Sequence, residues 1–155
     1  MDSNIGKICM NYKIISLLGH GSFGLVYKAK HIVSKKTFAI KLISSRVLKS
    51  DPRQRVALMR EIEALKDTSH PNVLGLADVF RTKSHYYIVT EYCNGGDISN
   101  HIRADKSRSH LHVGEIVARK LIRQVCNGML EISRKGYVHR DLKLANIFLS
   151  FPEGK

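Results

Sequence analysis

The chain has 155 residues, of which 43% are hydrophobic and 25% are charged, with 11 glycines and only 3 prolines. This composition excludes collagen-like and intrinsically disordered classes and predicts a globular domain of ordinary size. No apolar run reaches the about 20 residues that a membrane helix needs. The first residues also lack the basic start and apolar stretch of a secretory signal. We therefore expect no membrane span and a cytoplasmic location, with a nuclear location as the alternative.

The chain carries 26 basic and 13 acidic residues, which gives a net charge of +13. Such a charge suits nucleic acid, acidic lipid, or phosphorylated and acidic protein partners. The basic residues are spread along the chain rather than gathered in one block with interleaved aromatics, so a solvated surface is the simpler interpretation.

Cys9, Cys93 and Cys126 form no C-x-x-C pair. The sequence therefore predicts reduced thiols rather than a zinc site or disulfides.

The first part of the chain is dominated by alternating or apolar-rich runs, which are typical of strands. The expected strands are Tyr12 to Leu18, Leu25 to His31, Thr37 to Ile43, Val73 to Phe80 and Tyr86 to Tyr92. In the third of them, Lys41 shares one face with Ala39 and Ile43. A lysine in such an apolar stripe is costly unless it is paired or faces a ligand.

One helix is expected between the third and fourth strands. Asp51 is suited to cap it, and Pro52 is suited to its first position, where the missing N–H costs nothing. The helix would end near Asp67. Leu58, Ile62 and Leu65 recur at the three- and four-residue spacing of one helix face, which predicts that this face is turned toward the core. Glu61 lies on the same face.

The pattern becomes helical after Asn94, Gly95 and Gly96, so we place a boundary between a strand-rich lobe and a helical lobe near Cys93 to Gly96. The expected elements beyond it are a short helix from Asp97 to Ala104, a long helix from Val113 to Lys135 that ends at Gly136, and a strand from Ile147 to Leu149.

The segment from Gly19 to Gly24 reads Gly-His-Gly-Ser-Phe-Gly and fits the pattern G-x-G-x-x-G. Dinucleotide-binding folds use the same spelling, but they need a helix directly after the last glycine and an acidic residue about 20 positions on. Here an alternating strand follows Gly24, and no acid occurs between Ile40 and Arg46. A hairpin loop whose backbone N–H groups approach phosphate oxygens is therefore favoured.

The run His-Arg-Asp-Leu-Lys-Leu-Ala-Asn at positions 139–146 matches the H-R-D-x-x-x-x-N catalytic loop of protein kinases. The glycine loop, the sequence Phe-Ala-Ile-Lys ending at Lys41, and Glu61 resemble further motifs of the same family, in the family's order. The resemblance covers about Tyr12 to Leu149. It implies an α+β protein kinase-like fold with a five-stranded N-lobe, one helix in that lobe and the beginning of a helical C-lobe. The implied domain spans 12–155, with the N-lobe at about 12–93 and a partial C-lobe at about 94–155.

The resemblance also implies an ATP site. Lys41 would contact the α- and β-phosphates and Glu61 would hold it, although Glu63 is a nearby competitor. Asp97 is equally suited to contact the ribose and to cap a helix. The remaining residues expected to bind the nucleotide are Leu18, Gly19, Gly21, Ser22, Phe23, Gly24, Val26, Ala39, the small gatekeeper Thr90, and the hinge residues Glu91 and Cys93.

In the catalytic loop the resemblance implies that Asp141 deprotonates the acceptor hydroxyl, Lys143 stabilises charge on the moving phosphate, and Asn146 ligates Mg²⁺. A lysine two positions after the catalytic Asp resembles the serine/threonine kinases. We therefore expect a protein substrate with a Ser or Thr acceptor.

The family's Asp-Phe-Gly motif does not occur in the chain. The resemblance therefore implies an N-terminal portion of a serine/threonine kinase whose phosphoryl transfer is impaired, because Mg²⁺ is normally clamped by more than one protein oxygen. The main alternative is a non-catalytic nucleotide-binding or scaffolding protein, which would partner another kinase as a regulatory protein. A basic module for nucleic acid is a third and less favoured interpretation.

Overall fold

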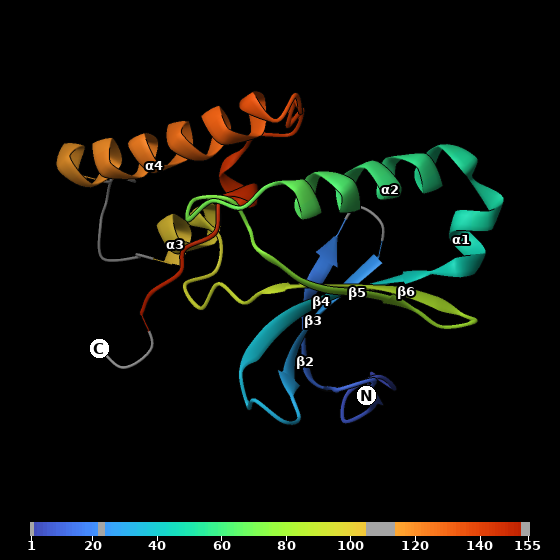
Figure 1. Cartoon of the computed structure of the whole chain (residues 1–155). Coiled ribbons are helices and arrows are strands. Elements are labelled where there is room, and N and C mark those ends of the chain that lie inside the picture. Colours follow the sequence, from blue (N-terminus) through green and yellow to red (C-terminus); the bar gives the residue numbers. More distant parts are fainter. Residues whose placement is uncertain (1, 22–23, 105–113, 153–155) are drawn as a thin grey trace. The chain divides into compact units, whose positions relative to one another are not determined.

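The computed structural model describes residues 2–21, 24–104 and 114–152 (Figure 1). The chain divides into two compact units, the first formed by residues 1–67 and 74–92 and the second by residues 68–73 and 93–155. The division near Cys93 lies where the pattern changes in the sequence. The short segment 68–73 groups with the second unit.

The described part of the first unit contains one antiparallel sheet with the strand order β1-β2-β3-β4-β6-β5. Its strands are β1 (Ile8–Cys9), β2 (Tyr12–Gly21), β3 (Gly24–His31), β4 (Thr37–Ser44), β5 (Leu76–Arg81) and β6 (His85–Glu91). The expectation of five strands is therefore wrong by one. The additional strand, β1, is only two residues long and follows no alternating pattern, and it joins β2 through a turn at Met10, whose φ is 54°.

Two helices, rather than the one expected, lie in the described part of this unit, and Figure 1 shows them following one another along the chain. Helix α2 (Pro52–Asp67) begins where the sequence predicts, and Asp51 Oδ1 accepts hydrogen bonds from the N–H groups of Arg53 and Gln54 at 2.9 and 3.3 Å. The missed helix is α1 (Ser45–Ser50), which is capped by Ser44. Six residues give too few turns for a periodic apolar pattern, which explains why it was missed.

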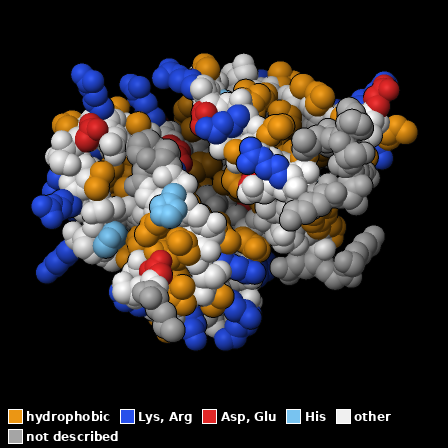
Figure 2. All heavy atoms as spheres, turned by 180° about the vertical axis from the view of Figure 1, so that it is seen from behind, with side chains coloured by type: hydrophobic (Ala, Val, Ile, Leu, Met, Phe, Trp, Pro, Cys, Tyr) orange, Lys and Arg blue, Asp and Glu red, His pale blue; other side chains and the backbone are white. Residues whose placement is uncertain are grey.

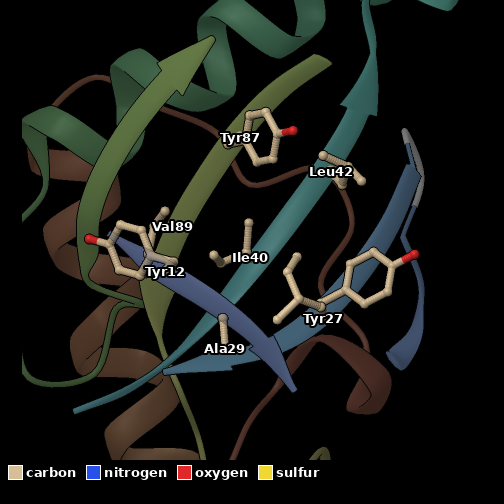
Figure 3. Packing of buried hydrophobic residues seen from close by; sticks show 8 residues of the cluster. Tyr12, Tyr27, Ala29, Ile40, Leu42, Tyr87 and Val89 are labelled. Atoms are coloured by element: carbon tan, nitrogen blue, oxygen red, sulfur yellow. The ribbon is translucent and has the colours of Figure 1, made fainter. Parts of the chain in front are cut away.

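The sheet buries side chains on both faces. Tyr27 and Ile40 lie in the larger apolar cluster, which Figure 3 shows between the strands; its buried members are Tyr12, Ile14, Tyr27, Ala29, Ile40, Leu42, Tyr87 and Val89. The opposite face packs against α1 and α2 in a second cluster of Ile43, Leu48, Leu58, Ile62 and Ile88. The predicted alternation along β4 is therefore correct, with Lys41 on the face that α2 covers in part.

The buried hydroxyl of Tyr27 ties the N-terminal segment to the sheet. It donates to Asp2 Oδ2 at 2.7 Å and accepts from Asn4 Nδ2 at 2.9 Å. The backbone N–H of Asn4 and the Tyr27 hydroxyl hold the pKa of Asp2 below its ordinary value. The Asp2 carboxylate is therefore ionised at neutral pH and is an acceptor for Tyr27.

We expect Tyr27→Phe to lower the free energy of unfolding by about 1 kcal/mol, because two hydrogen bonds of a buried hydroxyl are lost. Urea denaturation followed by circular dichroism measures this change. Tyr92→Phe is the matched control, because the Tyr92 hydroxyl makes no hydrogen bond with the described residues. Equal midpoints for the two variants would contradict the role of the Tyr27 hydroxyl.

The second unit contains α3 (Ile98–Ala104), α4 (Glu115–Arg134) and a short 3-10 helix, η1 (Leu144–Asn146). The predicted stop of the long helix is correct: Gly136 has a φ of 80°, and the N–H groups of Gly136 and Tyr137 bond to the carbonyls of Ser133 and Ile132. None of the helices in the described ranges is long and apolar enough to cross a membrane.

The expected strand from Ile147 to Leu149 is reduced to an isolated bridge between Phe148 and Asp97. It is nevertheless well tied, because the Ile98 N–H donates to Ile147 O at 2.9 Å and the Leu149 N–H donates to Gly96 O at 2.8 Å. Residues 147–149 therefore pair with the loop that precedes α3. These hydrogen bonds hold the segment that follows the catalytic-loop motif to the rest of the second unit.

Candidate active site

Lys41 and Glu61 form an ion pair within the first unit, with 2.8 Å between Nζ and Oε1. The Lys41 side chain is 17% exposed and that of Glu61 is 34% exposed. Helix α2 turns Glu61 toward the sheet because its neighbours Leu58 and Ile62 are buried there. Glu63 is exposed. The structure therefore brings Glu61, and not its competitor, to Lys41.

The glycine loop passes directly beside Lys41. A Cβ placed on Gly21 would lie 3.4 Å from both Lys41 Cε and Val26 Cγ2, whereas a Cβ on Gly19 would meet nothing within 4 Å. Gly24 differs from both, because a Cβ there would overlap the carbonyl oxygen of Leu42 on β4. The three glycines therefore serve different needs: open space at Gly19, contact with the lysine at Gly21, and close strand packing at Gly24.

The expected apolar walls lie around this pair on the same side of the sheet. Val26 is the cross-strand partner of Lys41, and Ala39 is the partner of Thr90. Thr90 is 9% exposed. Leu18 lies at a register shift of β2 and is 46% exposed, so its side chain is open to solvent. Ser22 and Phe23, which were also expected to bind the nucleotide, lie outside the described residues.

The hinge residue Glu91 has a structural contact that the sequence did not indicate. Its Oε1 accepts the Gly75 N–H at 2.7 Å, and its own N–H donates to Gly75 O at 3.0 Å. These two bonds join the end of β6 to the approach to β5. No periodic pattern marks such a contact, because it joins residues 16 apart through a tertiary turn. Cys93, at the other hinge position, accepts the Gly96 N–H through its carbonyl at 3.2 Å.

Asp97 caps α3. Its Oδ1 accepts the Asn100 N–H at 2.8 Å and its Oδ2 accepts Asn100 Nδ2 at 2.7 Å. Asp97 was expected either to contact the ribose or to cap a helix, and its hydrogen bonds are those of a helix cap. Both carboxylate oxygens already accept a hydrogen bond, so a ribose hydroxyl would have to share one of them.

The catalytic-loop motif forms a small network in the second unit. Lys143 Nζ lies 3.0 Å from both carboxylate oxygens of Asp141. Asn146 Nδ2 donates to Asp141 O at 2.7 Å and to Asp141 Oδ2 at 2.8 Å. Arg140 has a φ of 64°, an uncommon value for a residue other than glycine. The strained turn and the two donors together fix the direction of the Asp141 carboxylate.

Hydrogen bonds from Lys143 and then from Asn146 hold the pKa of Asp141 below its ordinary value. A lowered pKa keeps the carboxylate ionised at neutral pH, so it is ready to accept a proton. The Asn146 contact was not expected from the sequence, which indicated this residue only as a metal ligand. A side-chain bond across five positions follows no helix or strand period, so only the folded loop shows it.

The hydrogen bonds of this loop leave one side-chain atom that is suited to coordinate Mg²⁺. Because Asn146 Nδ2 donates to Asp141, the amide oxygen Oδ1 is the atom that remains to coordinate a hard cation. The described residues hold no group of three His, Cys, Asp or Glu side chains that could bind a metal by themselves. Any Mg²⁺ here would therefore depend on phosphate oxygens for part of its coordination.

Comparison with known proteins agrees with this geometry. The protein kinase domain family matches residues 12–155. The chain belongs to the protein kinase family. Among its relatives, the serine/threonine-protein kinase ATG1a of Arabidopsis thaliana is 35% identical over 147 residues, which is 95% of this chain and 22% of the relative.

Two further relatives of this kinase chain carry the same family label. The human serine/threonine-protein kinase ULK1 is 34% identical over 152 residues, which is 97% of this chain and 14% of the relative. The zebrafish (Danio rerio) serine/threonine-protein kinase PLK4 is 34% identical over 151 residues, which is 97% of this chain and 15% of the relative. The chain therefore spans less than a quarter of the length of each of these three kinases. Its family lies within the eukaryotic protein kinase superfamily.

Proposed function

We propose that this chain binds MgATP and transfers the γ-phosphoryl group to a Ser or Thr hydroxyl of a protein substrate. The observation that carries the proposal is the 2.8 Å ion pair between Lys41 and Glu61, with Gly21 packed against the Lys41 side chain. An ammonium held by a carboxylate beside an open glycine loop is suited to nucleotide phosphates, since backbone N–H groups and one fixed cation then face the same anion.

Each residue has a defined part in the proposed reaction. Lys41 contacts the α- and β-phosphates, and Glu61 fixes the direction of its ammonium. The Asp141 carboxylate accepts the proton of the acceptor hydroxyl as its oxygen bonds to the γ-phosphorus. The bond from that phosphorus to the β,γ-bridging oxygen breaks, ADP leaves, and Lys143 compensates charge on the transferred group. Mg²⁺, when bound through Asn146 Oδ1 and phosphate oxygens, neutralises charge on the β- and γ-phosphates.

The nucleotide base would lie against Leu18, Val26 and Ala39, with Thr90 as gatekeeper. Glu91 and Cys93 would supply backbone hydrogen bonds. The choice of Ser or Thr as acceptor is supported by Lys143, two positions after Asp141, and by the relatives, whose names describe serine/threonine-protein kinases.

A second candidate is nucleotide binding without transfer, in the service of a regulatory partner. It is favoured by one observation: the described residues hold no group of three His, Cys, Asp or Glu side chains that could bind a metal, so the proposed Mg²⁺ contact from the protein rests on Asn146. The two candidates share the Lys41 site and differ only at the chemical step.

The two candidates are separated by single-turnover transfer from ATP labelled at the γ-phosphate, with peptides that differ only in carrying Ser or Tyr as acceptor. We expect Mg²⁺-dependent label on the Ser peptide and not on the Tyr peptide. MgATP binding without any label on either peptide would favour the second candidate. Absence of MgATP binding would contradict both.

A further inference from the structure

A pocket of about 180 Å³ lies in the first unit, at the corner between α1, the first turn of α2 and the turn that joins β5 to β6. It is separate from the residues assigned above to ATP. Four cationic side chains line it: Lys49 from α1, Arg55 from α2, Arg81 from the end of β5 and Lys83 from the turn. Figure 2 shows Lys and Arg side chains projecting from the side of the molecule that carries α1, which is on the left in this view.

The charge of this pocket is unbalanced. No carboxylate is among its lining residues. Within the described residues, none of the four cations forms a salt bridge. Arg81 is held by Tyr86, with 3.3 Å between Nη1 and the hydroxyl. The four positive charges around the pocket repel one another. An anion that binds there reduces this electrostatic repulsion and also accepts new hydrogen bonds.

The lining of the same pocket also includes a serine with little exposed surface. Ser45 lines the pocket and is only 8% exposed, and its hydroxyl makes no hydrogen bond with the described residues. No enclosed side-chain oxygen or nitrogen among those residues lacks a partner, so the Ser45 hydroxyl keeps some contact with solvent. Its backbone N–H already donates to Ser84 O at 2.8 Å, which fixes the residue in place. A solvent-accessible hydroxyl on a residue that is otherwise held in place is a hydrogen-bond donor that a ligand can use.

We propose that this pocket binds the phosphate group of a phosphorylated peptide. A phosphate carries close to two charges and three acceptor oxygens, which suits several cations and a hydroxyl better than a single carboxylate would. The partly buried Tyr86 ring, which lines the pocket, supplies an apolar contact for a neighbouring peptide side chain. Tyr86 is the one aromatic residue among the lining residues of this pocket, which favours a phosphopeptide over nucleic acid, whose bases stack on several aromatic side chains.

The test uses the full 155-residue chain and a fluorescein-labelled hexapeptide with one phosphoserine between two leucines, followed by fluorescence anisotropy. We expect Arg55→Ala to weaken binding by about tenfold or more, the value of one charge-assisted hydrogen bond. Ser45→Ala is expected to give a smaller loss. The matched control is Arg53→Ala, because Arg53 carries the same charge on the same helix but does not line the pocket.

Binding that needs the phosphate, falls in Arg55→Ala and is unchanged in Arg53→Ala supports the proposal. Equal losses in the two arginine variants would indicate attraction to net charge and would overturn it. Equal binding of the unphosphorylated peptide would overturn it as well. Competition by inorganic phosphate as strong as that by the phosphopeptide would assign the pocket to a free anion instead. Displacement of the peptide from the pocket by a short RNA at lower concentration than by unlabelled phosphopeptide would assign it to nucleic acid.

Discussion

Asp141→Asn is expected to lower the rate of phosphoryl transfer to a Ser peptide by about 10²- to 10⁴-fold, the usual contribution of a positioned general base. Asparagine keeps the shape of the side chain but cannot accept the hydroxyl proton. It also removes the anion that holds Lys143 and Asn146, both of which donate to the Asp141 carboxylate. The measurement is the single-turnover rate at saturating MgATP.

The MgATP affinity should change little in this variant, because Lys41 and Glu61 belong to the other unit of the chain. Glu115→Gln is the matched control, since it also turns an exposed carboxylate that pairs with a cation into an amide. The lowered pKa of Asp141 means that its carboxylate is ionised throughout the neutral range. An undiminished rate in Asp141→Asn, or an equal loss in Glu115→Gln, would show that Asp141 is not the base.

Gly24→Ala is expected to lower the free energy of unfolding by about 1 to 3 kcal/mol, the usual cost of overpacking. The added Cβ would overlap the Leu42 carbonyl oxygen and would lie 3.1 Å from the Leu42 carbonyl carbon and 3.3 Å from Ile43 Cα. All three neighbours are backbone atoms of β4, so the start of β3 must move away from the strand that carries Lys41. Urea midpoints at an unchanged denaturant slope report the difference.

Gly19→Ala provides the matched control within the same loop. A Cβ on Gly19 meets nothing within 4 Å, so its stability should stay within about 0.5 kcal/mol of the wild type. We expect this variant instead to weaken MgATP binding, because the Cβ would occupy space that a phosphate needs. Equal destabilisation by the two substitutions would contradict the different roles assigned to the two glycines.

The larger elements of the fold were predictable because they follow a period. Alternation predicts β2, β3, β4, β5 and β6 to within a few residues. The spacing of Leu58 and Ile62 predicts Glu61 on the inner face of α2, where it contacts Lys41. Such signals arise because burial repeats along a regular element. The elements that escaped prediction, β1 and α1, are too short to show a period.

The site was predictable only in part, for a related reason. Motif spacing indicated Lys41, Asp141 and Asn146, but it could not show the contact of Asn146 with the Asp141 carboxylate or that of Glu91 with Gly75. The pocket beside α1 was also invisible, since its cations come from a missed helix, a second helix and a turn. These contacts form between segments that are separate in the sequence, so no pattern within a short stretch of sequence predicts them.

The most direct test of the proposed nucleotide site is the equilibrium affinity for MgATP, measured by isothermal titration calorimetry in the wild type, Lys41→Ala and Lys30→Ala. Lys30 is an exposed lysine of the neighbouring strand and serves as the matched control. We predict one saturable site that Lys41→Ala weakens by about 10- to 100-fold, the value of charge-assisted hydrogen bonds to phosphate, and that Lys30→Ala leaves unchanged. Equal affinities in the wild type and Lys41→Ala would contradict the assignment of Lys41 and Glu61 to the nucleotide phosphates.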